Sequence, residues 1–194
     1  MRIAARILLF TACLVAAQTQ PSPSSGAHLE SIEPIVKQQF GPTFTLPKKF
    51  PIVLITADFD GDGVEDVAII ADSKDPLPDS YDFKYTVADP YNSFFGFGNP
   101  RMTASYGRND PDHNHDLLVI LGAGPDNWRA AMPKAKFVLI NVPFDSIEVG
   151  RLIIKKKKPP IFVIRTIESQ VMESNVYWDA KKKQWKWQPG DPIE

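Results

Sequence analysis

The sequence predicts a mainly β domain, in which antiparallel sheets contain about eight short strands and one helix lies at the N-terminal end. The first observation is that short apolar, β-branched runs, separated by residues that favour turns, follow one another from Ile52 onward. The second is that only one segment, before Pro47, has its apolar residues at helical spacing. The length of 194 residues favours one domain over two.

The first 27 residues are expected to lie outside this domain. Two arginines precede an uninterrupted run of apolar or small residues from Ile7 to Ala17, which is typical of a secretory signal peptide and too short to span a bilayer. Residues 18–27 form a linker rich in proline and serine. We therefore expect a cleaved signal peptide over residues 1–17. Residues 28–194 would then form a periplasmic or extracellular domain without a transmembrane segment.

Cleavage of the signal peptide would remove the only cysteine, Cys13. The mature chain would then have no disulfide, no catalytic thiolate and no cysteine ligand for zinc. In the alternative interpretation, Cys13 is the acylated residue of a lipoprotein, but Phe10 stands where such signals usually carry leucine. Because residues 1–17 contain two arginines and no acids, 20 basic and 23 acidic residues remain, and no charge excess indicates a nucleic-acid partner.

The helix is predicted from His28 to Phe40. Its apolar residues recur at helical spacing, and Gly41 and Pro42 end it. Pro34 fits such a helix only in the first turn or at a break.

Eight strands are predicted after this helix. In chain order they are Ile52–Thr56, Val67–Ala71, Leu117–Leu121, Phe137–Asn141, Glu148–Ile154, Ile161–Ile167, Asn175–Trp178 and Gln184–Trp187. We expect the last two to form a hairpin around a turn at 179–183. Trp185 and Trp187 alternate with polar residues and therefore share one face of the last strand. They either cover the edge of the core or form a platform on which sugar rings stack.

Residues 72–116 interrupt the rhythm of short strands. The segment contains several prolines, many acids, and an aromatic run around Gly96 and Gly98. A loop of this length in a compact domain is usually functional or disordered, and disordered segments are poor in aromatic residues. We therefore expect an ordered excursion that packs over the sheet.

The segment 58–66, which reads DFDGDGVED, predicts a calcium-binding loop between two strands. Four aspartates stand at loop positions 1, 3, 5 and 9, with a glycine at position 6 that allows a tight backbone curve. Four carboxylates held together without a cation would repel one another, and calcium prefers such hard oxygen ligands. The expected ligands are Asp58, Asp60, Asp62, the carbonyl of Val64, and Asp66.

The loop differs from an EF-hand. Position 12 is Ile69, where an EF-hand has a bidentate glutamate, and the flanking segments are β-branched instead of amphipathic and helical. The alternatives to calcium are a metal-free Asp/Gly turn and another hard cation. In either case the loop is expected between strands.

The stretch TADFDGDGVEDVAIIA resembles the calcium loop of FG-GAP/VCBS repeats, which form the blades of integrin-α-like β-propellers. Leu117–Trp128 is similar to the next strand and glycine-rich turn of such a blade. The resemblance implies the same ligand set, with calcium as the cofactor. Only one loop of this kind is present and the chain is too short for four blades, so a complete propeller is not expected. The chain as a whole resembles small exported bacterial proteins that carry a single such loop, a resemblance that implies no activity.

Two weaker features have competing interpretations. His113 and His115 stand two residues apart among acids, which is typical of a solvated loop but also suits a second metal or a catalytic site. Lys155–Lys158 and Lys181–Lys183 form either solvated turns that protect sheet edges or a cationic patch for lipid phosphates or acidic glycans.

The sequence contains no G-x-S-x-G elbow, no HExxH and no P-loop. Two functions follow as hypotheses. The first is an exported calcium-binding β domain that acts as a non-catalytic binding or interaction module for a protein or glycan partner. The second is a cell-envelope hydrolase for sugars or phosphoesters, with its site near His113 and His115.

Overall fold

The computed structural model describes residues 29–48, 50–99, 115–156, 158–169 and 172–190. Within these residues, nine strands form two sheets, and the sheets do not close into a barrel. Of the two α-helices, the first has 12 residues and the second has five. This confirms the mainly β prediction with one N-terminal helix and no complete propeller. The predicted signal peptide and linker, and His113, lie outside the described residues. No helix of the described part is both long and apolar enough to cross a bilayer.

The first sheet has the strand order β1-β2-β4-β5-β3 and the second the order β6-β7-β8-β9. All neighbouring strands are antiparallel except β3 and β5, which are parallel. The strands are β1 (Leu54–Ala57), β2 (Asp66–Asp72), β3 (Thr86–Ala88), β4 (His115–Leu121), β5 (Ala135–Leu139), β6 (Ser146–Leu152), β7 (Ile161–Glu168), β8 (Met172–Asp179) and β9 (Gln184–Pro189). The helices are α1 (Leu29–Phe40) and α2 (Pro90–Phe94), with 3₁₀ turns η1 (Pro78–Ser80) and η2 (Gly124–Arg129).

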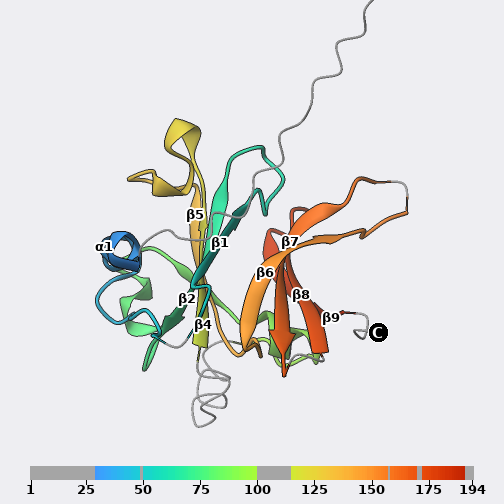
Figure 1. Ribbon diagram of the computed structural model, residues 1–194, viewed down its shortest axis with the longest axis horizontal. Coiled ribbons are helices and arrows are strands. Elements are labelled where there is room, and N and C mark those ends of the chain that lie inside the picture. Colours follow the sequence, from blue (N-terminus) through green and yellow to red (C-terminus); the bar gives the residue numbers. More distant parts are fainter. Residues whose placement is uncertain (1–28, 49, 100–114, 157, 170–171, 191–194) are drawn as a thin grey trace, which may run out of the picture.

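The first sheet is the middle layer of three, with α1 on one face and the second sheet on the other (Figure 1). Alternate residues of β2 and β4 enter two separate apolar clusters. Ile70 and Val119 face the second sheet, where Ile164 and Val176 pack against them. The neighbouring residues of the same strands face α1, in a cluster that includes Ile32, Val36, Phe40, Val67, Ile69, Leu118 and Ile120. Burial on both faces explains why these two strands are continuous apolar runs.

The described part of the excursion is ordered and joins the two sheets. Its strand β3 extends the first sheet beside β5, and the short helix α2 that follows packs on β9 of the second sheet. Asp89 links the two elements, because its buried carboxylate accepts hydrogen bonds from the backbone N–H of Asn92 and from the amide of Asn141.

Strand β3 and helix α1 differ from expectation, and the short helix α2 was not predicted. Strand β3 was not predicted, because it has three residues and depends on parallel pairing with β5, about fifty residues further along the chain. Helix α1 runs through Pro34, its sixth residue, without the expected break. Proline removes one backbone donor there, and packing of Ile32, Val36 and Phe40 against the first sheet holds the helix together.

Candidate metal centre

The segment 58–66 forms the connection between the antiparallel strands β1 and β2, as predicted. Asp66 begins β2 and pairs with Ala57, the last residue of β1, so the sheet fixes both ends of the loop. Gly61 and Gly63 adopt φ angles of +79° and +87°, and a Cβ atom on either would meet no other atom. The loop therefore needs glycine at both positions for its backbone conformation and not for space.

Backbone N–H groups of the loop point at its own carboxylates. Asp58 Oδ1 accepts from the N–H groups of Gly61 (2.8 Å) and Asp62 (3.0 Å), and its Oδ2 accepts from Gly63 (2.9 Å). Asp62 Oδ1 accepts from the N–H of Val64 at 2.9 Å. These bonds fix the orientation of the Asp58 and Asp62 carboxylates without an ion, since both oxygens of Asp58 and Oδ1 of Asp62 accept from backbone N–H groups.

Asp66 is the deepest of the four carboxylates, with 1% of its surface exposed. Its Oδ2 accepts from the N–H of Phe59 at 2.8 Å, and its Oδ1 from the N–H of Gly122 at 2.8 Å. Burial raises the pKa of Asp66 to about 7 against the effect of these donors, and the negative charge of Asp60 contributes to the rise. A buried carboxylate in this setting favours a cation beside it.

Asp58, Asp60 and Asp66 converge, with one carboxylate oxygen from each within 4.8 Å of the others. In the part of the chain that the structure describes, no other His, Cys, Asp or Glu side chains form such a group. Asp62 is not a member of this group, and its Oδ2 accepts a hydrogen bond from Lys134. Three of the four predicted aspartates are thus brought together, and the ligand role of every residue in the predicted set stays a prediction.

Lys134 supplies a positive charge at the edge of this group. Its Nζ lies 2.6 Å from Asp60 Oδ2 and 2.6 Å from Asp62 Oδ2. The two hydrogen bonds raise the pKa of Lys134 above its usual range, and the bond from Lys134 to Asp62 lowers the pKa of Asp62. The Asp60 side chain is only 2% exposed, so its negative charge is compensated by the ammonium group and not by water.

The connection between β4 and β5 packs against the loop at Val64 and Glu65. A Cβ atom on Gly122 would lie 2.4 Å from the carbonyl oxygen of Glu65 and 2.8 Å from a methyl carbon of Val64. The side chain of Glu65 turns away from the aspartates and accepts a hydrogen bond from the indole of buried Trp128 at 3.1 Å. Asn127, with φ at +54°, accepts the Glu65 N–H through its side chain at 3.4 Å.

The 72–116 excursion does not begin beside the loop. The excursion begins at Asp72, at the opposite end of β2 from Asp66, which is about 20 Å away for a seven-residue strand. The segment held against the loop is instead the β4–β5 connection, through Gly122 and Lys134. An ion in the loop would therefore order that connection.

The donor set suits a hard divalent cation. All converging side-chain atoms are carboxylate oxygens, with no imidazole or thiolate among them, which matches calcium better than zinc or copper. The ammonium group of Lys134 contacts Asp60 of this group and the neighbouring Asp62, which indicates that the loop favours positive charge.

His115 lies at the other end of β4 from this centre. Its Nδ1 is 2.5 Å from Asp72 Oδ1, the residue that it pairs with across the strands. Its ring packs edge-on against Phe50, with centroids 4.7 Å apart, and its side chain is 20% exposed. His115 therefore has one carboxylate partner in the described residues, while the predicted pairing with His113 stays a prediction.

Trp185 and Trp187 share a face of β9, as predicted, and both contact the core between the sheets. Trp185 is 4% exposed and packs against Trp178 at 5.6 Å, so its ring has no free surface for a sugar. Trp187 is half-buried beneath the edges of Tyr91 and Phe94 from α2. These placements favour the core role for both rings.

Comparison with known proteins finds no family model, no curated protein and no solved structure that matches the chain.

Proposed function

We propose that this protein is an exported calcium-binding β domain that acts as a non-catalytic binding or interaction module. The observation that carries the proposal is the convergence of Asp58, Asp60 and Asp66, with Asp66 buried and backbone donors already fixed on it. The ligands would be these carboxylates, with the Val64 carbonyl and Asp62 completing the set predicted from the loop spacing. Export rests on the signal peptide predicted from residues 1–17.

A structural role for calcium follows from what surrounds the loop. Its carboxylates accept hydrogen bonds from backbone N–H groups and would be ligands of the ion, which leaves no nucleophile or free base among them. When bound, calcium would supply charge compensation and hold the β1–β2 loop on the β4–β5 connection. Residues of the β4–β5 connection position the carboxylates: the Gly122 N–H donates to Asp66, and the Lys134 ammonium group contacts Asp60.

Thermal unfolding with and without calcium tests the proposal. At a hundredfold excess over Kd, one bound ion adds about 2.7 kcal/mol to the free energy of unfolding, which raises the melting temperature by roughly 5–10 °C for a domain of this size. Metal analysis of the purified protein before and after EDTA measures the stoichiometry. Asp60→Asn keeps the shape of the side chain but removes its charge, so the calcium-dependent shift should largely disappear.

Asp82→Asn is the matched control, because Asp82 is exposed and distant in sequence from the loop. It should keep the full calcium shift. A melting curve indifferent to calcium and to EDTA in the parent protein would overturn the proposal. Equal loss of the shift in both variants would overturn the assignment to this loop.

A further inference from the structure

The hairpin between β6 and β7 projects beyond the rest of the second sheet (Figure 1). Its tip carries two large apolar side chains, Ile153 and Ile154, that are 63% and 51% exposed. Neither belongs to the two apolar clusters of the domain. Two adjacent exposed isoleucines at the end of a projecting hairpin contribute little burial to the stability of the domain and leave apolar surface in water.

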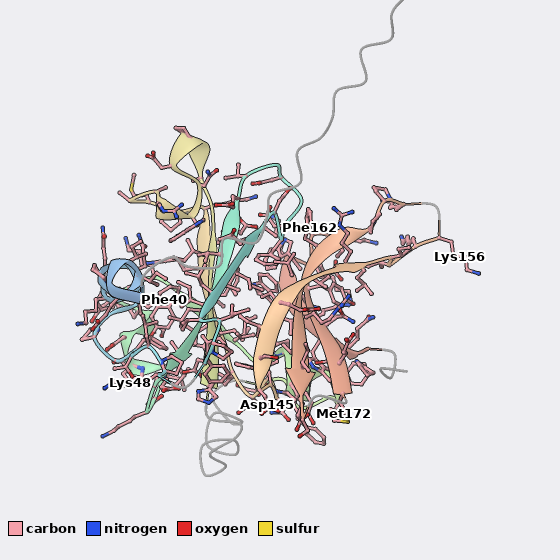
Figure 2. The ribbon with its side chains drawn as sticks, viewed as in Figure 1. Phe40, Lys48, Asp145, Lys156, Phe162 and Met172 are labelled. Atoms are coloured by element: carbon pink, nitrogen blue, oxygen red, sulfur yellow. The ribbon has the colours of Figure 1, made fainter. Side chains whose placement is uncertain are left out.

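The residues that follow are lysines. Lys155, Lys156 and Lys158 are exposed, and Figure 2 shows the side chain of Lys156 pointing outward at the end of the hairpin. None of these three ammonium groups forms an ion pair with any residue that the structure describes. The tip therefore combines unshielded positive charge with exposed aliphatic surface.

A second group of lysines lies at the same end of this sheet. Because β6, β7, β8 and β9 form an antiparallel meander, the β6–β7 and β8–β9 turns are at one end and the β7–β8 turn at the other. The β8–β9 turn contains Lys181–Lys183, all exposed. The acid at this end, Asp179, is engaged by the backbone N–H groups of two of these lysines and by Lys186 at 3.2 Å.

The charge of this end opposes that of the whole chain. Among the described residues, segments 151–163 and 179–186 contain eight basic side chains and one acid, whereas the chain has a formal net charge of −1. Edge protection places charged side chains on the edge strand itself. It does not account for cations gathered at the turns, beside two exposed isoleucines.

We propose that this end of the second sheet docks on an anionic lipid bilayer, with Ile153 and Ile154 inserted among the acyl chains and the two lysine turns against the headgroup phosphates. The proposal is independent of the calcium loop. The isoleucines select a bilayer over an acidic polysaccharide or a nucleic acid, because only a bilayer offers an apolar phase to aliphatic side chains. Aliphatic side chains also lack the aromatic faces on which bases and sugars stack.

Co-sedimentation with vesicles tests the proposal on the intact protein. We expect binding to phosphatidylcholine vesicles that contain phosphatidylglycerol, and none to phosphatidylcholine alone. Lys155→Gln/Lys156→Gln should lower the partition coefficient about 25-fold, since each lysine near an anionic surface contributes about a fivefold factor. Ile153→Asn/Ile154→Asn, with every lysine intact, should lower it about tenfold or more.

Lys48→Gln/Lys74→Gln is the matched control, because it removes two exposed charges outside the two turns and should leave vesicle binding unchanged. Lys48 lies on the side of the molecule away from Lys156 (Figure 2). All three variants alter exposed side chains, and their melting temperatures should equal that of the parent protein. Failure to bind anionic vesicles would overturn the proposal. So would binding that ignores the isoleucine change and is equalled by binding to a soluble sulfated polysaccharide, since that partner would be a polyanion without a bilayer.

Discussion

Replacement of Lys134 by glutamine distinguishes the contribution of the lysine ammonium group at the loop from that of calcium. Lys134 contacts Asp60 and Asp62 at 2.6 Å each, on carboxylates that belong to the predicted calcium ligand set. If calcium binds there, the ammonium group must leave or share these oxygens. The substitution removes its charge and keeps most of its length, and it should therefore destabilise the calcium-free protein while it tightens calcium binding.

The magnitude follows from the exposure of the pair. The Lys134 side chain is 47% exposed, so solvent screens both contacts and each contributes within the range of surface ion pairs, about 0.2–1 kcal/mol. Burial of the Asp60 carboxylate places its contact toward the upper end. Lys134→Gln should thus lower the free energy of unfolding without calcium by about 1 kcal/mol, which lowers the melting temperature by about 2–4 °C.

Lys134→Gln should bind calcium more tightly than the parent protein. Because the ion no longer displaces a bound ammonium group, the same energy of about 1 kcal/mol lowers the Kd for calcium about fivefold. At saturating calcium the parent and the variant should melt together. Calorimetric titration measures the Kd, and melting curves across a calcium series measure the convergence.

Lys37→Gln is the matched control, because Lys37 forms an exposed pair with Glu33 on α1, far from the loop in sequence. It should change stability by a few tenths of a kcal/mol at every calcium concentration and leave the Kd unchanged. A Kd for Lys134→Gln that equals or exceeds the parent value, with a constant gap between the melting curves, would refute competition between Lys134 and calcium.

Three further substitutions test the support of the loop, the core and the excursion. Gly122→Ala places a methyl group against the loop backbone and should cost about 1–3 kcal/mol in thermal unfolding while shrinking the calcium shift; an unchanged melting curve would contradict the packing. Ile69→Ala should cost about 2–5 kcal/mol in urea unfolding because Ile69 is fully buried, whereas Ile52→Ala, at a side chain 45% exposed, should cost under about 1 kcal/mol; similar losses would contradict the assigned core. Asp89→Ala removes the buried cap of α2 and should change the fluorescence of Trp187, which lies under that helix, with a loss of about 1–2 kcal/mol; unaltered emission would show that α2 does not depend on the cap.

The strands were predictable where local sequence decides the structure. Strands β2 and β4 are buried on both faces, so their residues are apolar throughout and the turn residues around them define their ends to within one or two positions. Strand β3 was not predictable, because Thr86–Ala88 gains its place from a parallel partner remote in sequence. The same holds for Pro34, since tertiary packing keeps α1 continuous where local propensity favours a break.

The convergence of the aspartates was predictable from the sequence, and the residues that surround them were not. The spacing of Asp58, Asp60 and Asp66 within nine residues is a local pattern, and local patterns survive in sequence. Gly122 was visible only as part of a glycine-rich turn, and its role requires knowing that β4 pairs with β2. Nothing distinguished Lys134 from other lysines, because its partners lie more than seventy residues earlier in the chain.

The presence of Lys134 decides how calcium dependence should appear. A domain whose carboxylates had no other compensation would unfold when the ion was removed, because the buried negative charge would stand alone. Here the ammonium group offsets part of that charge, and the two apolar clusters hold the sheets together with Phe59 as the one loop residue among their described members. The metal-free protein should therefore remain folded in EDTA and differ from the calcium form in melting temperature and in the order of the β4–β5 connection.

Amide hydrogen exchange tests this expectation. Calcium should slow exchange at Gly122 and Asn127 and leave exchange at Ile164 in the second sheet unchanged. Loss of the whole fold in EDTA would mean that the ion contributes far more than the loop geometry implies.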